Sequence, residues 1–352
     1  MGKSVADSKR HISGIAFLGS DFTPENVELT IQNGIIADIE PSRSPAEQYI
    51  LPAFFNAHTH LGDTVALDTP ADRPLAELVA PPDGLKHRIL RAASNEDLAS
   101  GIRNSIQYMK QSGTLGFADF REGGMDGVEM LSSCMDCEMT ALILGRDGGE
   151  LHPNASGIGL SSAHGLASEF EAFDAVKKMG RITAVHAGEG KTTDIDAAFA
   201  LQPDIIIHGT HFREQDIRRA ADEGISVCLC PRSNWTLHVS SSPEHPPVKQ
   251  LLDAGVNLLL GTDNAMFVPP DMFSECAFLM TVYGVSAEDA LKAATAGFNL
   301  AGQKTGIEKG NPANLTILDA AGLTSWSRKP LATALQRLGR ASVTEVISSK
   351  RV

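Results

Sequence analysis

Two histidines close an apolar stretch in the first fifth of the chain. The stretch reads LPAFFNAHTH, and its last three residues include His58 and His60. Side chains two positions apart in an extended chain point to the same side of a strand. Two imidazoles on one side of a strand end can bind one metal ion, although a His-x-His pair taken alone is as often incidental.

Further polar side chains stand at the ends of later apolar runs. His186 and Glu189 close RITAVHAGE, His208 lies near the end of DIIIHGTH, and Asp263 lies near the end of VNLLLGTDN. Taken alone, His208 could be a core histidine and Asp263 a cap or turn residue. Polar groups at the ends of four separate apolar runs are much harder to attribute to coincidence.

The pattern from residue 51 onward predicts how these residues are positioned. Short apolar runs alternate with helical patterns, such as the one between a capping Ser94 and Gly113. Eight strands are expected, on YILPAFFNAH, TLGFADF, MTALILG, GIGLSS, RITAVHAGE, DIIIHGTH, GISVCLCP and VNLLLGTDN. Eight strands alternating with helices over about 250 residues are typical of an α/β fold, the (β/α)8 TIM barrel. The carboxyl ends of such strands meet at one mouth, where the active sites of these barrels lie.

Strand-like sequence occurs outside this region, towards both ends of the chain. NVELTIQNGIIADIE places Asn33 and Gly34 between two alternating apolar runs, which is a strong hairpin signal. GNPANLTILD and ASVTEVISS return to strand character near the C-terminus. We therefore expect residues 1–50 and 306–352 to form one small β-sandwich-like domain beside a barrel of residues 51–305.

Composition excludes several classes of function. The apolar fraction of 42% and the charged fraction of 21% are ordinary for a globular protein. A net charge of −13 without a Lys/Arg cluster argues against nucleic acid as a partner. No apolar run approaches the roughly 20 residues of a membrane span, and MGKSVADSKR lacks the apolar centre of a signal peptide. A cytoplasmic location is expected.

The five cysteines do not form the pattern of a disulfide framework, because their number is odd and their spacing uneven. Cys134 and Cys137 form a Cys-x-x-Cys motif inside a predicted helix. Because no second pair accompanies it, we interpret the motif as a packed or partly exposed thiol pair rather than as a redox or metal site.

The order and spacing of the motifs resemble the amidohydrolase superfamily over nearly the whole chain. The matching segments are ILPAFFNAHTH, VHAGE, IIIHGTH, LLLGTDN and the closing GIEKGNPANLTILD. The spacing of His186 and Glu189, together with CPRSNWTL, is most similar to the branch of cytosine, guanine and S-adenosylhomocysteine deaminases and triazine hydrolases. GIGLSSAH contains no lysine, so the carboxylated-lysine bridge of two-metal relatives is not supplied, and one metal is expected.

The resemblance implies a role for each candidate residue. One divalent metal ion, Zn²⁺ in preference to Fe²⁺, would be held by His58, His60, His186 and Asp263. The ion would lower the pKa of a bound water, and Asp263 would take the proton of that water. Glu189 would protonate the ring nitrogen beside the attacked carbon, and His208 would stabilise charge on the attacking oxygen.

Polar residues that follow other strands are candidate substrate contacts. These are Arg121, Glu122, Arg146, His164, Ser233 and Asn234. Together with Arg232, the arginines favour an acidic or carboxylate-bearing substrate, and ion pairs within the protein are the alternative for each. The loop NAMFVPPDMF lacks the Ser-Asn-Asn run of nucleoside-type relatives, which counts against a purine nucleoside.

The sequence therefore predicts a metal-dependent deaminase of a small aminated heterocycle, such as a purine, a pyrimidine or a nucleoside-like molecule. Hydrolysis of an amide, a cyclic imide or a carbon–chlorine bond at the same site is one alternative. A non-catalytic, metal-bearing binding protein is another, which the proton-transfer residues disfavour. The partner is a small molecule, neither nucleic acid nor a membrane, and a homodimer is the family-level expectation.

Overall fold

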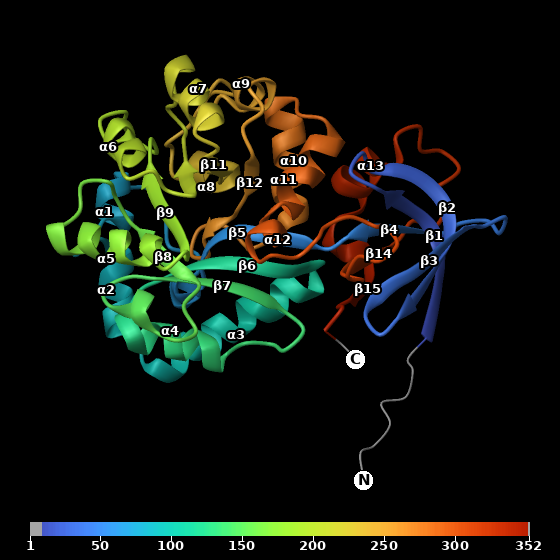
Figure 1. The fold of residues 1–352 in the computed structure, drawn as a ribbon, viewed down its shortest axis with the longest axis horizontal. Helices are drawn as coiled ribbons and strands as arrows, with labels where there is room; N and C mark the ends of the chain where they lie inside the picture. Colours follow the sequence, from blue (N-terminus) through green and yellow to red (C-terminus); the bar gives the residue numbers. More distant parts are fainter. Residues whose placement is uncertain (1–8, 351–352) are drawn as a thin grey trace, which may run out of the picture.

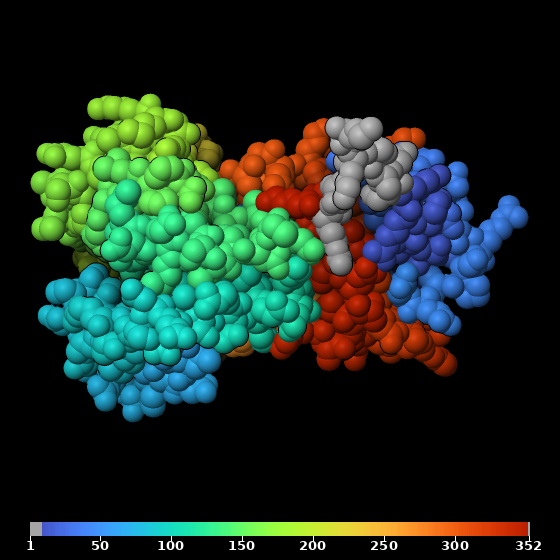
Figure 2. All heavy atoms as spheres, turned by 90° about the horizontal axis from the view of Figure 1, so that it is seen from below, coloured from blue at the N-terminus to red at the C-terminus, as the bar shows by residue number. Residues whose placement is uncertain are grey.

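A computed structural model of the chain describes residues 9–350, which fold into a barrel and a smaller β domain (Figure 1). Figure 2 shows the C-terminal residues lying between the barrel and the N-terminal strands. None of the helices in the described part of the chain combines the length and apolar character that a membrane span requires.

The barrel is built from parallel strands in the order β12-β11-β10-β9-β8-β7-β6-β5-β13. The strands are β5 (Phe54–His60), β6 (Thr114–Arg121), β7 (Thr140–Gly145), β8 (Gly157–Leu160), β9 (Ile182–Ala187), β10 (Ile205–His208), β11 (Ser226–Leu229), β12 (Leu258–Leu260) and β13 (Asp263–Asn264). The sequence-based prediction of a (β/α)8 barrel is confirmed.

The eighth predicted strand is two short strands, β12 and β13, and the second of them closes the barrel against β5. A Cβ atom on Gly261 would lie 2.7 Å from the backbone nitrogen of His58, so only glycine fits where the chain crosses β5. Asn56 bridges the break, because its side chain accepts from the Thr262 amide at 3.0 Å and donates to the Thr262 hydroxyl at 2.7 Å.

Helices lie between the strands and cover the outside of the barrel (Figure 1). They are α1 (Leu75–Val79), α2 (Leu85–Ala92), α3 (Asn95–Gln111), α4 (Gly124–Ser133), α5 (Ala167–Lys178), α6 (Ile195–Ala200), α7 (Glu214–Asp222), α8 (Pro231–Thr236), α9 (Val248–Asp253), α10 (Met272–Tyr283), α11 (Ala287–Thr295) and α12 (Gly297–Leu300). The 3-10 turns η1 (Leu61–Ala66) and η2 (Gly149–Leu151) follow β5 and β7. Ser94 caps α3 as expected, accepting a hydrogen bond from the Asp97 amide at 3.1 Å.

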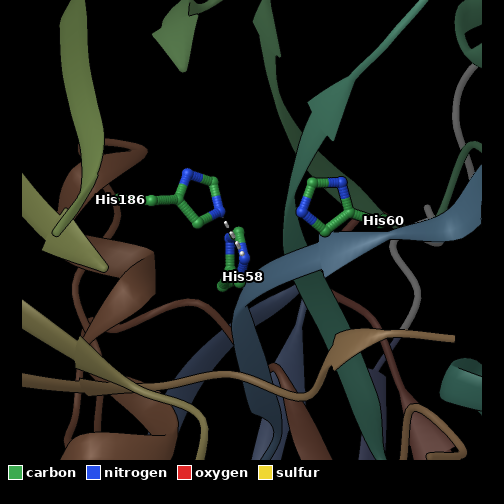
Figure 3. A group of neighbouring side chains, drawn as sticks. All are labelled: His58, His60 and His186. Atoms are coloured by element: carbon green, nitrogen blue, oxygen red, sulfur yellow. Dashed lines mark hydrogen bonds between the residues drawn. The ribbon is translucent and has the colours of Figure 1, made fainter. Parts of the chain in front are cut away.

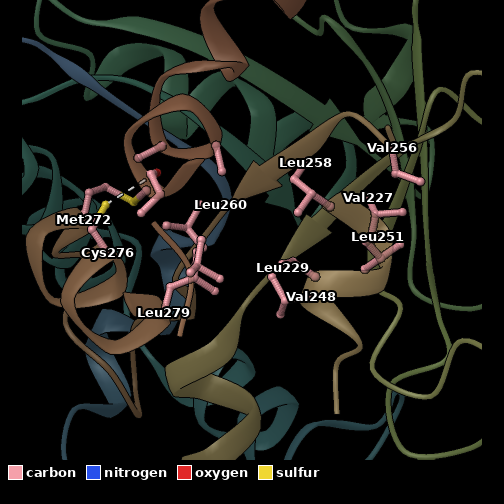
Figure 4. Close-up of a cluster of buried hydrophobic side chains, with 14 of the residues drawn as sticks. Val227, Leu229, Val248, Leu251, Val256, Leu258, Leu260, Met272, Cys276 and Leu279 are labelled. Atoms are coloured by element: carbon pink, nitrogen blue, oxygen red, sulfur yellow. Dashed lines mark hydrogen bonds between the residues drawn. The ribbon is translucent and has the colours of Figure 1, made fainter. Parts of the chain in front are cut away.

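Apolar side chains on the outer faces of the strands pack against these helices. Figure 4 shows Leu258 and Leu260 of β12, with side chains of β11, meeting α9 and α10. Leu259, one position along, belongs to a different buried cluster that includes Phe120. This alternation follows from the period of two in a strand and buries apolar side chains on both faces of the barrel strands.

The smaller domain is a six-stranded sheet in the order β15-β14-β4-β1-β2-β3. Its strands are β1 (Lys9–Leu18), β2 (Thr23–Gln32), β3 (Ile35–Pro41), β4 (Gln48–Pro52), β14 (Leu315–Asp319) and β15 (Val343–Ile347). The expected hairpin joins β2 to β3, with φ of 51° at Asn33 and 74° at Gly34. The segments α13 (Pro330–Thr333), η3 (Ala334–Leu338) and η4 (Arg340–Ser342) precede β15. N- and C-terminal strands thus share one sheet, and residues 1–8 and 351–352 of the predicted domain lie outside the described residues.

The expectation that Cys134 and Cys137 lie inside one helix is wrong. Helix α4 ends at Ser133, with Cys134 as its buried C-cap and Cys137 exposed beyond it. Lys110 pairs with Asp136 at 2.7 Å and with Glu138 at 2.9 Å, which fastens the segment to α3 as a turn. All five thiols are free.

Candidate active site

The mouth of the barrel brings together the polar residues predicted to close its strands. His58 and His60 lie on β5, His186 on β9, His208 ends β10 and Asp263 begins β13. Figure 3 shows His58 between His60 and His186, with a dashed line joining His58 to His186. Potential ligand atoms lie within 4.8 Å of one another in two sets that share His58: one with His60 and His186, the other with His208 and Asp263.

Two of these residues have a left-handed backbone. Strand alternation would turn His208 outward beside Ile206, away from Ile205 and Ile207. A φ of 75° instead brings the ring of His208 to 5.5 Å from that of His186. Asp263 has a φ of 63°. A non-glycine residue in this region costs about 1–2 kcal/mol and is retained where the surrounding structure fixes it, often at functional sites.

Acceptor oxygens fix the protonation of two imidazoles. Nδ1 of His186 lies 2.8 Å from the Leu160 carbonyl, and Nδ1 of His60 lies 3.0 Å from Oε1 of Glu122. Since neither oxygen carries a proton to give, each Nδ1 is the donor. The Nε2 atoms of His60 and His186 therefore present lone pairs to the centre of the site.

His208 is fixed in the same way by Asn234. The Asn234 amide nitrogen donates to the Thr210 hydroxyl at 2.8 Å, which leaves its oxygen 3.1 Å from Nδ1 of His208. His208 Nδ1 is then the donor, and Nε2 is free for the site. Asn234 thus supports His208 from behind.

The nitrogen and oxygen atoms at the centre cannot all be satisfied by hydrogen bonds to one another. Nε2 of His58 lies 3.2 Å from Nε2 of His186 and 3.2 Å from Oδ1 of Asp263, and Nε2 of His60 lies 3.6 Å from the same oxygen. One proton on His58 could serve only one of these neighbours, and Nδ1 of His58 is buried without a hydrogen-bond partner among the described residues. Converging imidazole nitrogens and a carboxylate are the donor set that Zn²⁺ takes, so the residues fit a divalent cation.

Burial keeps these histidines in the form that binds metals. It lowers the pKa of His58 and of His186, and lowers that of His60 to about 3. For Asp263, burial alone would raise the pKa, but the hydrogen bond with His58 lowers it well below the ordinary value. Ser233 also donates to Oδ2 of Asp263 at 2.7 Å. The site therefore offers neutral imidazoles and an ionised carboxylate near pH 7.

Glu189 lies beside this donor set without belonging to either group of potential ligands. It follows β9, and its Oε1 is 3.7 Å from Nε2 of His208. Burial raises the pKa of its carboxyl, which keeps more of the protonated form near neutral pH. A carboxylic acid at this place can deliver a proton to a bound molecule.

Glu122 is the centre of an ion-pair cluster next to His60. It accepts from Arg146 at 2.7 Å and from Arg121 at 2.9 Å. Lys86 of α2 lies 2.8 Å from Glu122 and 3.0 Å from Asp63, a pairing that sequence reasoning missed. Helix α2 has the sequence LKHRILRA, and nothing in this sequence indicates that Lys86, rather than another of its basic residues, meets Asp63 and Glu122.

The remaining candidate substrate contacts lie in different places. Ser233 and Asn234 are fully buried behind Asp263 and His208. His164 is exposed at the rim, with Nε2 3.3 Å from the Thr193 carbonyl. Arg232 pairs with buried Glu275 at 2.8 Å. Roles for these residues in substrate binding stay predictions.

A cavity of about 1500 Å³ opens over the site. Its wall includes site residues and the cluster around Glu122, with further side chains from α1 to α4 and the loops after β8 and β9. The members from the candidate site are His60, His186, Glu189, His208 and Asp263. A molecule in this cavity would therefore contact both the donor set and the acid.

Comparisons with known proteins agree with this geometry. Residues 169–350 match the profile of the Amidohydrolase family. A putative aminohydrolase of Methanothermobacter thermautotrophicus is 32% identical over 350 residues, covering 87% of this chain and 90% of the relative. An adenine deaminase of Sinorhizobium medicae is 33% identical over 142 residues, 38% of this chain and 44% of that protein. The crystal structure of a zinc-bound adenosine deaminase from Xanthomonas campestris superposes with a TM-score of 0.80 at 21% identity, covering 97% and 91% of the two chains.

Proposed function

The chain belongs to the amidohydrolase family, and from this premise we propose that it is a metal-dependent deaminase of an aminated heterocycle. It is a hydrolase acting on carbon–nitrogen bonds other than peptide bonds. Relatives named adenine deaminase support an aminated ring as the substrate. The zinc in the adenosine deaminase of similar fold supports Zn²⁺ over Fe²⁺.

The proposal gives the metal to four residues and leaves two for proton transfer. A single divalent ion would be held by His58, His60, His186 and Asp263, where it would lower the pKa of a bound water. Asp263 is ionised and able to accept the proton of that water. Nε2 of His208 would form a hydrogen bond with the attacking oxygen and stabilise the charge that develops there.

The acid required by the attack on the ring is Glu189. As the water oxygen bonds to the ring carbon, electrons move onto the neighbouring ring nitrogen, and Glu189 gives that nitrogen a proton. The proton held by Asp263 then passes to the amino group, the carbon–nitrogen bond breaks, and ammonia leaves. The hydroxyl that the attack places on the ring carbon then gives its proton to Glu189 as the product carbonyl forms, so each residue finishes in its starting state.

The observation that carries the proposal is the position of Glu189. Its carboxyl group has a raised pKa and lies 3.7 Å from His208, beside the donors but outside both sets of potential ligands. Hydrolysis of an amide or a cyclic imide has less need of a second proton donor, because no ring nitrogen must be neutralised. A carbon–chlorine bond at the same place would release chloride instead of ammonia.

The test is a screen of aminated purines, pyrimidines and triazines for ammonia release by protein loaded with Zn²⁺. Release of ammonia that is abolished by a chelator and restored by Zn²⁺ supports the proposal. Chloride release from chlorinated rings without ammonia release from aminated ones would overturn it.

Because all five thiols are free, we also infer a reducing, cytoplasmic location.

A further inference from the structure

We propose that the substrate carries an uncharged, apolar substituent beside its aminated ring, and that this substituent lies against an apolar wall formed by α1 to α4. The inference rests on the proposed function and narrows it to a class of substrate. It comes from the size, the lining and the charge of the cavity rather than from the metal donors.

The cavity is larger than a single ring system requires. Its volume of about 1500 Å³ exceeds the range of about 300–1,000 Å³ that is usual for pockets that enclose a whole drug-sized ligand. An aminated ring held at His208 and Glu189 occupies only the end of the cavity that the barrel mouth supplies. The rest of the cavity is continuous with this end and is lined by residues of α1 to α4.

That remaining space has an apolar side, which we call the apolar wall. It consists of Leu75, Val79, Leu90, Leu98, Ile102 and Met130. Leu75 and Val79 are one turn apart on α1, as are Leu98 and Ile102 on α3, so each helix turns one face to the cavity. All of them except Ile102 are only half-buried, so a ligand can still cover apolar surface there.

The charges near the site disfavour an acidic substituent. Lys86, Arg121 and Arg146 already face Glu122, so their charges are neutralised within the protein. Arg91 pairs with Asp83, and Lys191 is exposed at the rim. The cavity wall carries eight carboxyl groups against five lysine and arginine side chains. The arginines noted in the sequence thus form the ion pairs that were their alternative interpretation, and they offer no unpaired cation to an anionic substituent.

The experiment compares matched ligands that differ only in the substituent. Adenine and cytosine are each tested unsubstituted, with a butyl group on N9 or N1, and with a carboxypropyl group at the same position. Zinc-loaded protein should show at least about a tenfold higher kcat/KM for a butyl derivative than for its parent ring. The carboxypropyl derivatives should show no such gain. Equal or better use of the carboxypropyl compounds, or no gain from butyl, overturns the inference.

The same ligands separate this inference from the proposed function. If no compound releases ammonia, the proposed deamination fails for these rings, and calorimetric binding of the same set to the zinc-loaded protein still tests the wall. Tighter binding of the butyl compounds would then support the inference, and indifferent binding would overturn it. Ammonia release without a butyl preference leaves the proposed function intact and rejects the wall.

A pair of methionines on α4 provides matched variants. Met130 lies in the apolar wall, whereas Met125, on the same helix, is 46% exposed and does not belong to the wall. Met130→Gln should reduce the ratio of butyl to parent kcat/KM several-fold, and Met125→Gln should leave that ratio unchanged. Leu98→Asn on α3 should reduce it as well and serves if Met130→Gln does not fold. Equal ratios in all variants, or an equal loss in Met125→Gln, would overturn the assignment of the wall.

Discussion

Replacing Glu122 by glutamine should weaken the contact that orients His60 and leave the other candidate metal ligands in place. The carboxylate accepts from Nδ1 of His60 at 3.0 Å and faces cations at 2.7–2.9 Å, while its side chain is only 13% exposed. Burial would raise its pKa, but the charges of Lys86 and Arg146 and the hydrogen bond from His60 lower it well below the ordinary value, so it is ionised. Glu122→Gln keeps the shape of the side chain and removes one negative charge.

The size of the effect follows from the cluster. Three cations face three carboxylates in the native protein: Lys86, Arg121 and Arg146 face Asp63, Asp119 and Glu122. Breaking a buried ion pair costs about 3–5 kcal/mol, and the amide oxygen can still accept one hydrogen bond, so we expect about 3 kcal/mol of lost stability. Loss of the partner that orients a metal-binding histidine weakens metal affinity by about 10- to 100-fold.

The loss of stability is measured by urea unfolding of the metal-free protein. The loss of metal affinity is measured by competition for Zn²⁺ with a chromophoric chelator, under conditions where all variants are folded. Glu129→Gln is the matched control, because Glu129 lies on the same cavity wall but its side chain is 68% exposed and pairs with His152 at 3.1 Å. That exposed pair contributes at most about 1 kcal/mol, so neither measurement should change much. If Glu122→Gln bound Zn²⁺ as tightly as the native protein, the orientation of His60 by this carboxylate would be refuted, even if stability fell.

Three further predictions concern the donor set and the acid. His58→Ala should lose the bound metal, measured by elemental analysis after desalting, and retention of a full equivalent would contradict the assignment. Glu189→Gln should keep the metal and lose about 10²- to 10⁴-fold in kcat; because burial raises the pKa of Glu189, native kcat should fall on the alkaline side as this acid loses its proton, and a normal rate in the variant would exclude the role. Metal-free protein should lose stability as the pH falls from about 6.5 towards 3, because the pKa of His60 is lowered to about 3 and the unfolded chain then binds a proton that the folded chain does not. The loss from this residue is about 1.4 kcal/mol per pH unit, and denaturant unfolding of His60→Gln should show a shallower dependence.

The sequence predicted the parts of the site that stand at strand ends. His58, His186 and Asp263 could be placed together because parallel strands in a barrel bring their carboxyl ends to one mouth. The break between β12 and β13 was not predicted, because it depends on the contact of Gly261 with His58 and on the side chain of Asn56, which lie about 200 residues apart in the chain.

The contacts that sequence reasoning missed are made by residues whose partners no hydrophobic periodicity predicts. Lys86 sits on a short helix after a long loop, and only the folded chain shows that its ammonium group meets Asp63 and Glu122. Arg121 and Arg146 were recognised as residues near the mouth, but their partners could not be inferred, because a charge at a strand end can face a ligand or a neighbouring side chain equally well. The location of a group at the mouth is thus a property of the strand pattern, whereas its partner depends on loops with no pattern of their own.

The backbone strain at the site and the convergence of its lone pairs both indicate that the site is kept for binding a cation. Left-handed conformations at His208 and Asp263 cost about 1–2 kcal/mol each, and each turns a donor atom towards atoms that also carry lone pairs. Neither conformation stabilises the metal-free fold, because a regular strand conformation at His208 or Asp263 would not carry this strain. A cation at the point where His58, His60, His186 and Asp263 converge would satisfy the lone pairs that these residues cannot satisfy for one another, and the binding energy would offset the strain. Strained His208 and Asp263 lie next to His58, whose Nδ1 has no hydrogen-bond partner among the described residues. This is the pattern expected when a site is kept for what it binds rather than for the stability of the chain.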